Sequence, residues 1–559
     1  MWAPCLHGRW HPNCQSYVEY IPTILNHDTC WNHAMKRSLV VAVVVLAATM
    51  AARAEAGSPV RPFESDSDSV AQGRIDDLVL GQLKHLGIAP ARMCSDGVFV
   101  RRLYLDVLGT LPTAEEAGRF LKDSDPEKRR KLIDRLFERE EFADYWALKW
   151  CDLLRVKSEF PIKLWPNAVQ AYHRWIRTCV KENVPYDRFV REMLTASGSN
   201  FRDPQVNFYR AVQSREPQAV AQAVALGFMG VRPETWTKER WSGMAAFFSQ
   251  IGYKPTGEWK EEIVLFDFDK ARSPAGVQSL AAAAFPDATP VHLSPGEDPR
   301  EVFANWLITP TNPWFARNIA NRVWFWLLGR GIVHPADDFR PDNPPVNPEL
   351  LTFLQQDLIA ARYDMKHLVR RILNSTTYQL SFVAGSNDPR AEANFAQYPL
   401  RRLEAEVLID ALCQVTGTTE QYASIIPEPY TFMPEDQRAV ALADASITSP
   451  FLEKFGRSSR DSGLESDRNN RPMASQRLHM LNSSHVRRKL ETSPKLRALL
   501  ESNPRSPEAV TELYLTILSR FPMEQEQESV KKYVKNGGGT PLRDLAWALI
   551  NGPEFCYRH

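Results

Sequence analysis

The sequence predicts a mainly α-helical protein, with two associated helical lobes, irregular Pro-rich loops and one small β-hairpin. Three observations lead to this prediction. In the run KLIDRLFEREEFADYWALKWCDLLR, apolar residues recur at three- and four-residue spacing, as in an amphipathic helical pair. Thr113 and Glu116 have the spacing of a helix capping box. The 40 prolines and 15 tryptophans of the 559-residue chain indicate large buried side chains joined by rigid, irregular connections.

The N-terminal region has the pattern of an export signal. Residues 1–34 lack regular periodicity, whereas from Met35 a Lys-Arg pair precedes the apolar run SLVVAVVVLAATM and the small-residue stretch ARAEAG, which offers two A-x-A cleavage sites. The apolar run is short for a membrane span. We therefore expect residues 1–34 to be a mis-called extension and residues 35–56 to be a signal peptide. The mature protein would be periplasmic or secreted, with no transmembrane span; the alternative is an uncleaved membrane anchor.

The remaining chain divides into four stretches by composition. Residues 57–74 are rich in Ser and Asp and predict a flexible lead-in. Helical patterning predicts one helical domain over residues 75–250 and a second over residues 301–559. Between them, residues 251–300 are rich in Pro and Gly and predict an irregular insertion, with a hairpin around IVLFDFD.

The overall composition is that of an ordinary globular protein, with 44% hydrophobic and 24% charged residues. A formal net charge of +1 and the lack of a long basic run argue against nucleic acid as a partner. Five cysteines follow the predicted cleavage site without a CxxC pair, so no disulfide framework is specified and we expect small buried side chains. These are Cys94, Cys151, Cys179, Cys413 and Cys556.

Two segments of the chain resemble other segments of the same chain. LYLDVLGTLPTAEEA (103–117) is similar to LYLTILSRFPMEQEQ (513–527), and DRFVREMLTAS (187–197) is similar to KHLVRRILNST (366–376). The similarity predicts a recurrent unit, in which a helix is followed by a Pro-marked turn and a second, capped helix. The spacings differ too widely for a regular solenoid.

The segment from 312 to 351 has the highest density of candidate site residues. Asn312 can cap a helix that starts at Pro313, and Gly329 can end it. The polar positions at helical spacing on this aromatic helix are Arg317, Asn321 and Arg322. The Pro-rich loop that follows holds Asp337, Asp338, Arg340, Asp342 and Asn343.

These polar residues support several interpretations. Asp337 and Asp338 could form an acid/base pair or a structural ion-pair network. Together with Asp342 and Asn343, whose side chains also offer oxygen ligands, they could instead bind calcium. A buried Arg322 needs a carboxylate partner, and Asp338 is the one expected from its proximity in sequence. In the structural interpretation, Arg317, Asn321, Arg322, Arg340 and Asn343 clamp the loop onto the helix; in the functional one, the arginines bind an anion or a carboxylate-bearing ligand.

Aromatic and histidine residues give weaker indications. Four tryptophans could form a platform for carbohydrate, although their spacing favours core packing; they are Trp306, Trp314, Trp324 and Trp326. His479 and His485 are the closest histidine pair, but six residues apart they would lie on different faces of a continuous helix. HExxH, GxSxG, Walker and dinucleotide-binding patterns do not occur in the sequence.

Long motifs connect the chain to a known pair of domains. The stretch 312–351, with YDMKHLVRRILNSTTYQLS (363–381) and YPLRRLEAEVLIDALCQVTG (398–417), resembles the exported planctomycete-specific PSD domain family. FVRRLYLDVLGTLPTAEEAGRFL (99–121) and the sequence up to MAAFF (244–248) resemble the companion PSCyt domain. Both are domains of unknown function.

The chain departs from many such relatives at two motifs. Where the resemblance implies a C-x-x-C-H-x-H-P segment, this chain has LGFMGVRPETWTKERWSGMAAFF (226–248), and where it implies a C-x-C, Leu464 and Ser466 stand instead. Covalent haem needs two thiols and a histidine, and CxxCH occurs nowhere in the sequence. We therefore predict no cofactor.

These observations lead to one functional expectation and two alternatives. We expect a non-catalytic scaffold or binding component of the cell envelope or secretome, with exported or envelope proteins as partners and carbohydrate as a further ligand class. The first alternative is a hydrolase that acts on extracellular polymers through carboxylates near Asp337–Asp338. The second is a cytochrome-related redox protein, against which the missing thiols argue.

Overall fold

The computed structural model describes most of the chain that follows the predicted signal peptide. It covers residues 62–559 except 159–163, 292, 294–295, 428, 503–505 and 536–540. The predicted extension (1–34) and signal peptide (35–56) lie outside the described residues. Within them, none of the helices combines the length and apolar character that crossing a bilayer requires.

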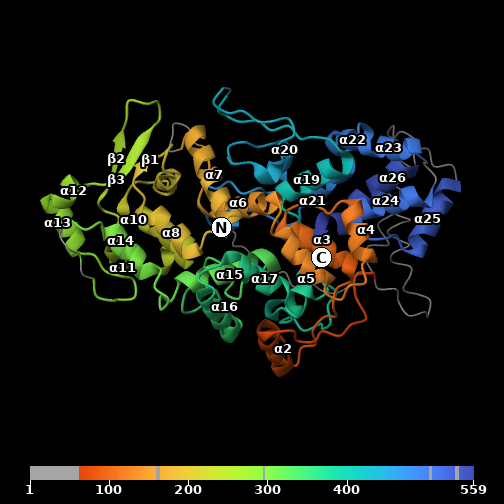
Figure 1. Cartoon of the computed structure of the whole chain (residues 1–559), viewed down its shortest axis with the longest axis horizontal. Helices are drawn as coiled ribbons and strands as arrows, with labels where there is room; N and C mark the ends of the chain where they lie inside the picture. Colours follow the sequence, from red (N-terminus) through yellow and green to blue (C-terminus); the bar gives the residue numbers. More distant parts are fainter. Residues whose placement is uncertain are drawn as a thin grey trace, which may run out of the picture.

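The described residues form a mainly α-helical protein with Pro-rich loops, which confirms the predicted fold class (Figure 1). The helices of the first part are α2 (Arg74–Leu86), α3 (Asp96–Val107), α4 (Ala114–Lys122), α5 (Lys128–Leu136), α6 (Glu140–Leu153), α7 (Pro166–Lys181), α8 (Tyr186–Thr195), α9 (Asn207–Arg210), α10 (Pro217–Val224), α11 (Lys238–Ala246), α12 (Phe268–Arg272) and α13 (Pro274–Ala281). Those of the second part are α14 (Pro299–Leu307), α15 (Phe315–Leu328), α16 (Pro348–Ala360), α17 (Met365–Leu373), α18 (Thr376–Gln379), α19 (Ala405–Thr416), α20 (Pro450–Lys454), α21 (Ala474–Asn482), α22 (Ser484–Glu491), α23 (Pro494–Ser502), α24 (Pro507–Leu518), α25 (Glu524–Lys535), α26 (Pro541–Ile550) and α27 (Pro553–Cys556).

Helix α4 begins with the capping box that the sequence predicts. The Thr113 hydroxyl accepts from Glu116 N at 3.1 Å, and Glu116 Oε2 accepts from Thr113 N at 2.9 Å. These two bonds satisfy backbone N–H groups that the first turn of a helix leaves without partners.

Helix α15 begins two residues later than predicted. Its first residue is Phe315 rather than Pro313. Asn312 still serves the predicted purpose, since its Oδ1 accepts from the backbone N–H groups of Trp314 and Phe315. Gly329 ends the helix in the left-handed conformation, with φ 71°.

The predicted hairpin is present in the 251–300 stretch. Strands β2 (Ile251–Pro255) and β3 (Glu262–Phe266) pair antiparallel, with Ile251 opposite Phe266. A third strand, β1 (Gly198–Ser199), adds to the free edge of β3. A second, two-stranded sheet joins β4 (Arg401–Arg402) to β5 (Tyr557–Arg558).

The two predicted helical lobes are associated through one continuous hydrophobic cluster, which extends from Ile75 to Phe555. Helix α2 packs on α16 and α18, and α4 packs on α24. In Figure 1 the orange helix α4 therefore lies beside the blue helix α24. Segments from opposite ends of the chain thus complete the same core.

The internal similarity of 103–117 and 513–527 extends to side-chain contacts. Glu116 and Glu526 occupy equivalent positions, and each accepts a hydrogen bond from the backbone N–H three residues before it. Each also pairs with an arginine, Arg139 at 2.6 Å and Arg520 at 2.8 Å respectively. The same turn is therefore built twice, with the same type of ion pair.

Candidate functional site

The loop after α15 brings a buried carboxylate to a junction of three chain segments. Asp337 is fully buried. Arg232 Nη2 and Nε donate to Asp337 Oδ1 at 2.6 and 3.1 Å, and the backbone N–H of Glu465 donates to Asp337 Oδ2 at 2.9 Å. Both carboxylate oxygens therefore have partners from distant parts of the sequence.

A backbone irregularity places Arg232 at this junction. Helix α10 continues into the π-helical turn η4 (Ala225–Met229), which ends at Gly230 in the left-handed conformation. Phe339 N donates to Gly230 O at 2.8 Å, and Asn318 Nδ2 donates to Gly227 O at 3.1 Å. The segment before Arg232 is thus fixed to both α15 and the Asp337 loop, and π-helical turns are common at functional sites.

The predicted pairing of Arg322 with Asp338 is wrong. Arg322 is 2% exposed, and its guanidinium donates one long bond, 3.4 Å, to Leu226 O; Nε has no partner among the described residues. Asp338 instead lies 3.3 Å from Arg340 and 3.9 Å from Arg232. The guanidinium of Arg322 thus contacts the backbone of η4, and the carboxylates of Asp337 and Asp338 pair with Arg232 instead.

The other predicted residues of this segment hold the loop in place or lie at its edge. Asn321 is fully buried, donates to Val333 O and accepts from Val333 N, both at 2.9 Å. Asn343 Nδ2 donates to Asp338 O at 2.8 Å. Arg317 is half-buried, and this burial lowers its pKa.

The three carboxylates considered for calcium are not arranged as one ligand set. The Asp342 side chain is 75% exposed and its partner is Arg340, at 3.5 Å. Asp337 is directed to Arg232 and the backbone of Glu465. Across the part of the chain that the structure describes, His, Cys, Asp and Glu side chains form no group of three or more placed to hold a metal ion.

Glu465 is the residue of this junction with the most unusual protonation. Burial raises its pKa to about 8, the negative charge of Asp337 adds to the increase, and the positive charge of Arg322 opposes it. A carboxyl group with this pKa is largely protonated at neutral pH. It can therefore donate a proton, as a general acid does.

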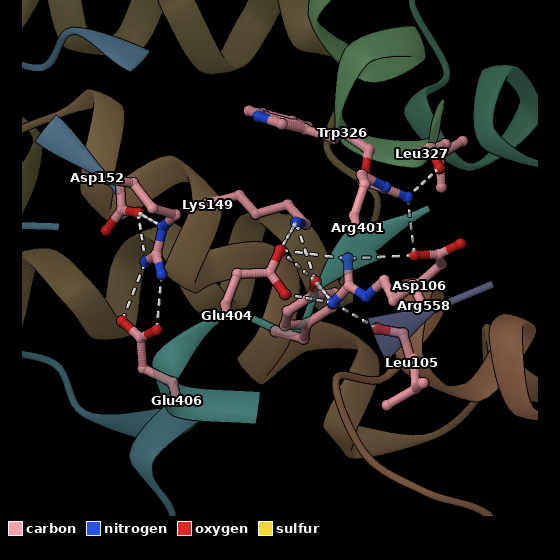
Figure 2. Close-up of polar contacts among 12 residues, drawn as sticks. Leu105, Asp106, Lys149, Asp152, Trp326, Leu327, Arg401, Glu404, Glu406 and Arg558 are labelled. Atoms are coloured by element: carbon pink, nitrogen blue, oxygen red, sulfur yellow. Dashed lines mark hydrogen bonds and ion pairs between the residues drawn. The ribbon is translucent and has the colours of Figure 1, made fainter. Parts of the chain in front are cut away.

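Figure 2 shows an extended ionic network. It adjoins the junction, because Arg468 and Lys149 lie close enough to Glu465 to oppose the rise in its pKa. Arg558 Nη1 is 3.2 Å from both Glu404 Oε1 and Asp106 Oδ1. Lys149 Nζ lies 3.9 Å from Glu404 Oε1, and burial lowers the pKa of Lys149 to about 8 although Glu404 opposes the change. These charged side chains can be buried together because each has an oppositely charged neighbour.

The second half of the network is centred on Arg468. Its guanidinium lies 2.7 Å from Asp152 and 2.6 Å from Glu406. Arg460 supplies a further ion pair to Asp152, at 2.9 Å. Helix α6 contributes both Lys149 and Asp152. These two charged residues of a largely apolar helix therefore pair with Glu404 and Arg468 in the second part of the chain.

Sequence reasoning missed Arg232, Glu465, Lys149 and Glu404. One signal was present, because Lys149 interrupts the apolar run WALKWC on α6, and a charge inside an apolar helix face requires a partner. Glu465 lies between Leu464 and Ser466, the positions at which the resemblance described in the sequence analysis implies a C-x-C. No local pattern indicates that Arg232 reaches Asp337.

The tryptophans considered for carbohydrate are core residues. Trp324 is fully buried and Trp326 is 9% exposed. Trp306 and Trp314 are partly buried and packed against the core; Trp306 stacks on Phe285, with 4.8 Å between ring centroids, and meets Trp314 at a tilted angle. All four side chains thus pack against other aromatic residues.

Comparison with protein families gives two matches. Residues 74–251 match PSCyt2, a protein family of unknown function (DUF1549), and residues 299–534 match PSD1, a protein family of unknown function (DUF1553). No curated protein and no solved structure matches the chain. The junction takes Arg232 from the first matched segment and Asp337 and Glu465 from the second, and the neighbouring network takes Lys149 and Asp152 from the first and Glu404 and Arg468 from the second.

Proposed function

Given that the chain belongs to the proteins that combine a PSCyt2 and a PSD1 domain, we propose that it is an exported, non-catalytic scaffold or binding component of the cell envelope or secretome. The observation that carries this proposal is the enclosed state of Asp337. Its two oxygens are engaged by Arg232 and the Glu465 backbone, and its side chain is fully buried. Such a carboxylate stabilises a junction and is poorly placed to meet a substrate.

An exposed apolar surface supports a binding role. We call it the aromatic surface; it consists of Trp259, Ile425, Tyr430 and Phe432, which are 69, 86, 51 and 74% exposed. Trp165 connects its two parts, since its ring lies 5.2 Å from Tyr430, and Lys260 lies over the rings of both Trp165 and Trp259. Exposed apolar side chains gathered in one place are typical of contact sites for proteins or sugars.

Substitution of the aromatic surface tests this role. The double variant Trp259→Ser/Phe432→Ser should keep the wild-type Tm, because both side chains are exposed, but lose retention of envelope proteins or of insoluble polysaccharide in co-sedimentation. Val277→Ser, at a 57% exposed position of α13, is the matched control. Equal retention by all three proteins would contradict the proposal.

A hydrolase is the second candidate, because Glu465 has a raised pKa and lies beside the negative charge of Asp337. Such a pair of carboxyl groups can divide the acid and base roles. Hydrolysis of an extracellular polymer by the wild type, lost in Glu465→Gln at unchanged Tm, would favour this candidate over the scaffold. A set of polymers left intact by both proteins would favour the scaffold.

Export is part of the proposal and has its own test. Cleavage at either A-x-A site gives a mature protein that starts at Glu55 or Gly57. Mass spectrometry of the protein recovered from the periplasm or medium of an exporting host should find one of these N-termini. Recovery with the membrane, with the apolar run intact, would support the uncleaved anchor instead.

A further inference from the structure

Two imidazole rings meet where the chain turns between α21 and α22. The sequence suggests that His479 and His485 lie on different faces if their helix is continuous. The structure instead ends α21 at Asn482 and starts α22 at Ser484, with Ser483 extended between them. The turn brings His479 Nε2 to 3.5 Å from His485 Nδ1.

A carboxylate orients the second ring. His485 Nε2 lies 2.8 Å from Glu420 Oε2, and Lys489 Nζ lies 2.9 Å from the same oxygen. With His485 Nε2–H donating to this carboxylate oxygen, the lone pair of the ring is on Nδ1, the atom that faces His479.

We propose that His479 and His485 bind a divalent transition-metal ion, zinc or copper in type, with Glu420 as the residue that orients His485. Two imidazole nitrogens bound to one tetrahedral zinc ion at about 2.0–2.1 Å lie about 3.3 Å apart. The 3.5 Å separation in the structure is close to that spacing. A carboxylate behind a ligating histidine is also the usual arrangement at protein metal sites.

The surroundings of the pair suit such an ion. Both histidines are partly exposed, so water can supply the remaining ligands. The rings of Phe451 and Phe455 lie 5.7 and 5.9 Å from His479 and limit its movement. The polar atoms of the pair therefore lie at a partly exposed position with an aromatic wall on one side.

Zinc titration of the full-length protein by calorimetry tests the site. His479→Ala and His485→Ala should each remove one equivalent of Zn²⁺ binding that the wild type shows. Glu420→Gln should keep the stoichiometry but weaken that affinity about 10- to 100-fold, because the ring loses its orienting partner. Histidines and cysteines before residue 62 are common to all variants, so the differences report on this site alone.

His367→Ala is the matched control. His367 also has a carboxylate partner, Asp357 at 2.8 Å, but no second imidazole pairs with it among the residues that the structure describes. Its loss should leave the zinc isotherm unchanged. Circular dichroism checks that each variant is folded, and His479→Gln replaces His479→Ala if the latter is not. A wild-type isotherm matched by the histidine variants, or unaltered affinity in Glu420→Gln, overturns the proposal. This site is separate from the Asp337 junction, so either proposal can fail alone.

Discussion

The backbone N–H of Glu465 donates a 2.9 Å hydrogen bond to Asp337 Oδ2, and Arg232 pairs with the other oxygen of the same carboxylate. One side chain of the PSD1 segment thus connects the PSCyt2 segment to a loop far along the chain. Because Asp337 is fully buried, water cannot replace either partner. The shortest contacts of the junction therefore depend on the charge of Asp337, with Asp338 farther from Arg232, at 3.9 Å.

Asp337→Asn should destabilise the protein by about 3 kcal/mol. The amide keeps the shape of the side chain but removes the nearest negative charge to Arg232, which is 22% exposed, and leaves it Asp338 at 3.9 Å. Urea unfolding measures the loss. Asp342→Asn, at a 75% exposed side chain, is the control and should stay within about 0.5 kcal/mol of the wild type. Similar midpoints for both variants would mean that Asp337 is not a structural charge.

Glu465 predicts a stability that decreases as the pH rises. Its pKa is about 8 in the folded protein and 4.5 as the ordinary value, so the folded state binds more protons between these values. Its contribution is fully present below about pH 4.5 and is lost on the way to pH 8, by at most about 1.4 kcal/mol per pH unit. Glu465→Gln should flatten this part of the curve in pH-dependent urea unfolding. Substitution of the exposed Glu138 by Gln should leave the slope as it is in the wild type.

Arg558→Ala should cost about 3–5 kcal/mol. Asp106 is 1% exposed and would keep its hydrogen bonds from the Tyr378 and Tyr398 hydroxyl groups, but its nearest cation would then be Arg401, at 3.5 Å. The substitution also removes the shortest ion pair of Glu404. Guanidinium chloride unfolding gives the free-energy difference. Arg390→Ala, which breaks an exposed pair with Asp388, should change stability by less than about 1 kcal/mol. A loss for Arg558→Ala no larger than this would show that the network is redundant.

Gly230→Ala should destabilise more than Gly87→Ala. Both glycines end a helical turn at nearly the same left-handed φ, 67° and 71°. A Cβ at Gly87 meets nothing within 4 Å, whereas one at Gly230 would lie 2.6 Å from Asn318 Oδ1. We expect about 1 kcal/mol for Gly87→Ala from backbone conformation alone and a clearly larger loss for Gly230→Ala. Thermal unfolding of the two variants side by side makes the comparison, and equal Tm shifts would exclude the close approach at Gly230.

Local signals in the sequence were enough to predict much of the fold. The Thr113 capping box and the C-terminal Gly329 depend on residues within one helical turn, so they can be read without knowing the tertiary structure. The hairpin β2–β3 was predicted for the same reason. Strand β1 was not, because two residues, Gly198 and Ser199, are too few to show alternation.

The candidate site depends on contacts that no local pattern contains. Arg322 was paired with Asp338 because the two are close in sequence, but the π-helical turn η4 lies against Arg322 and directs Arg232 to the acids instead. The histidine pair shows the same limit. An uninterrupted helix separates His479 from His485, and one extended residue, Ser483, brings them together.

The contacts of α3 with the end of the described chain also determine when this protein can fold. Arg101 donates to Phe555 O, Arg102 donates to His559 O, and Asp106 pairs with Arg558. During synthesis the first segment emerges long before these partners, so its buried charges stay uncompensated and a native core cannot form. We therefore expect the first segment to complete its native packing only after the last helices have been made, and contacts between such distant residues form slowly. A chain that stays unfolded while it is made is also one that a membrane channel can still carry.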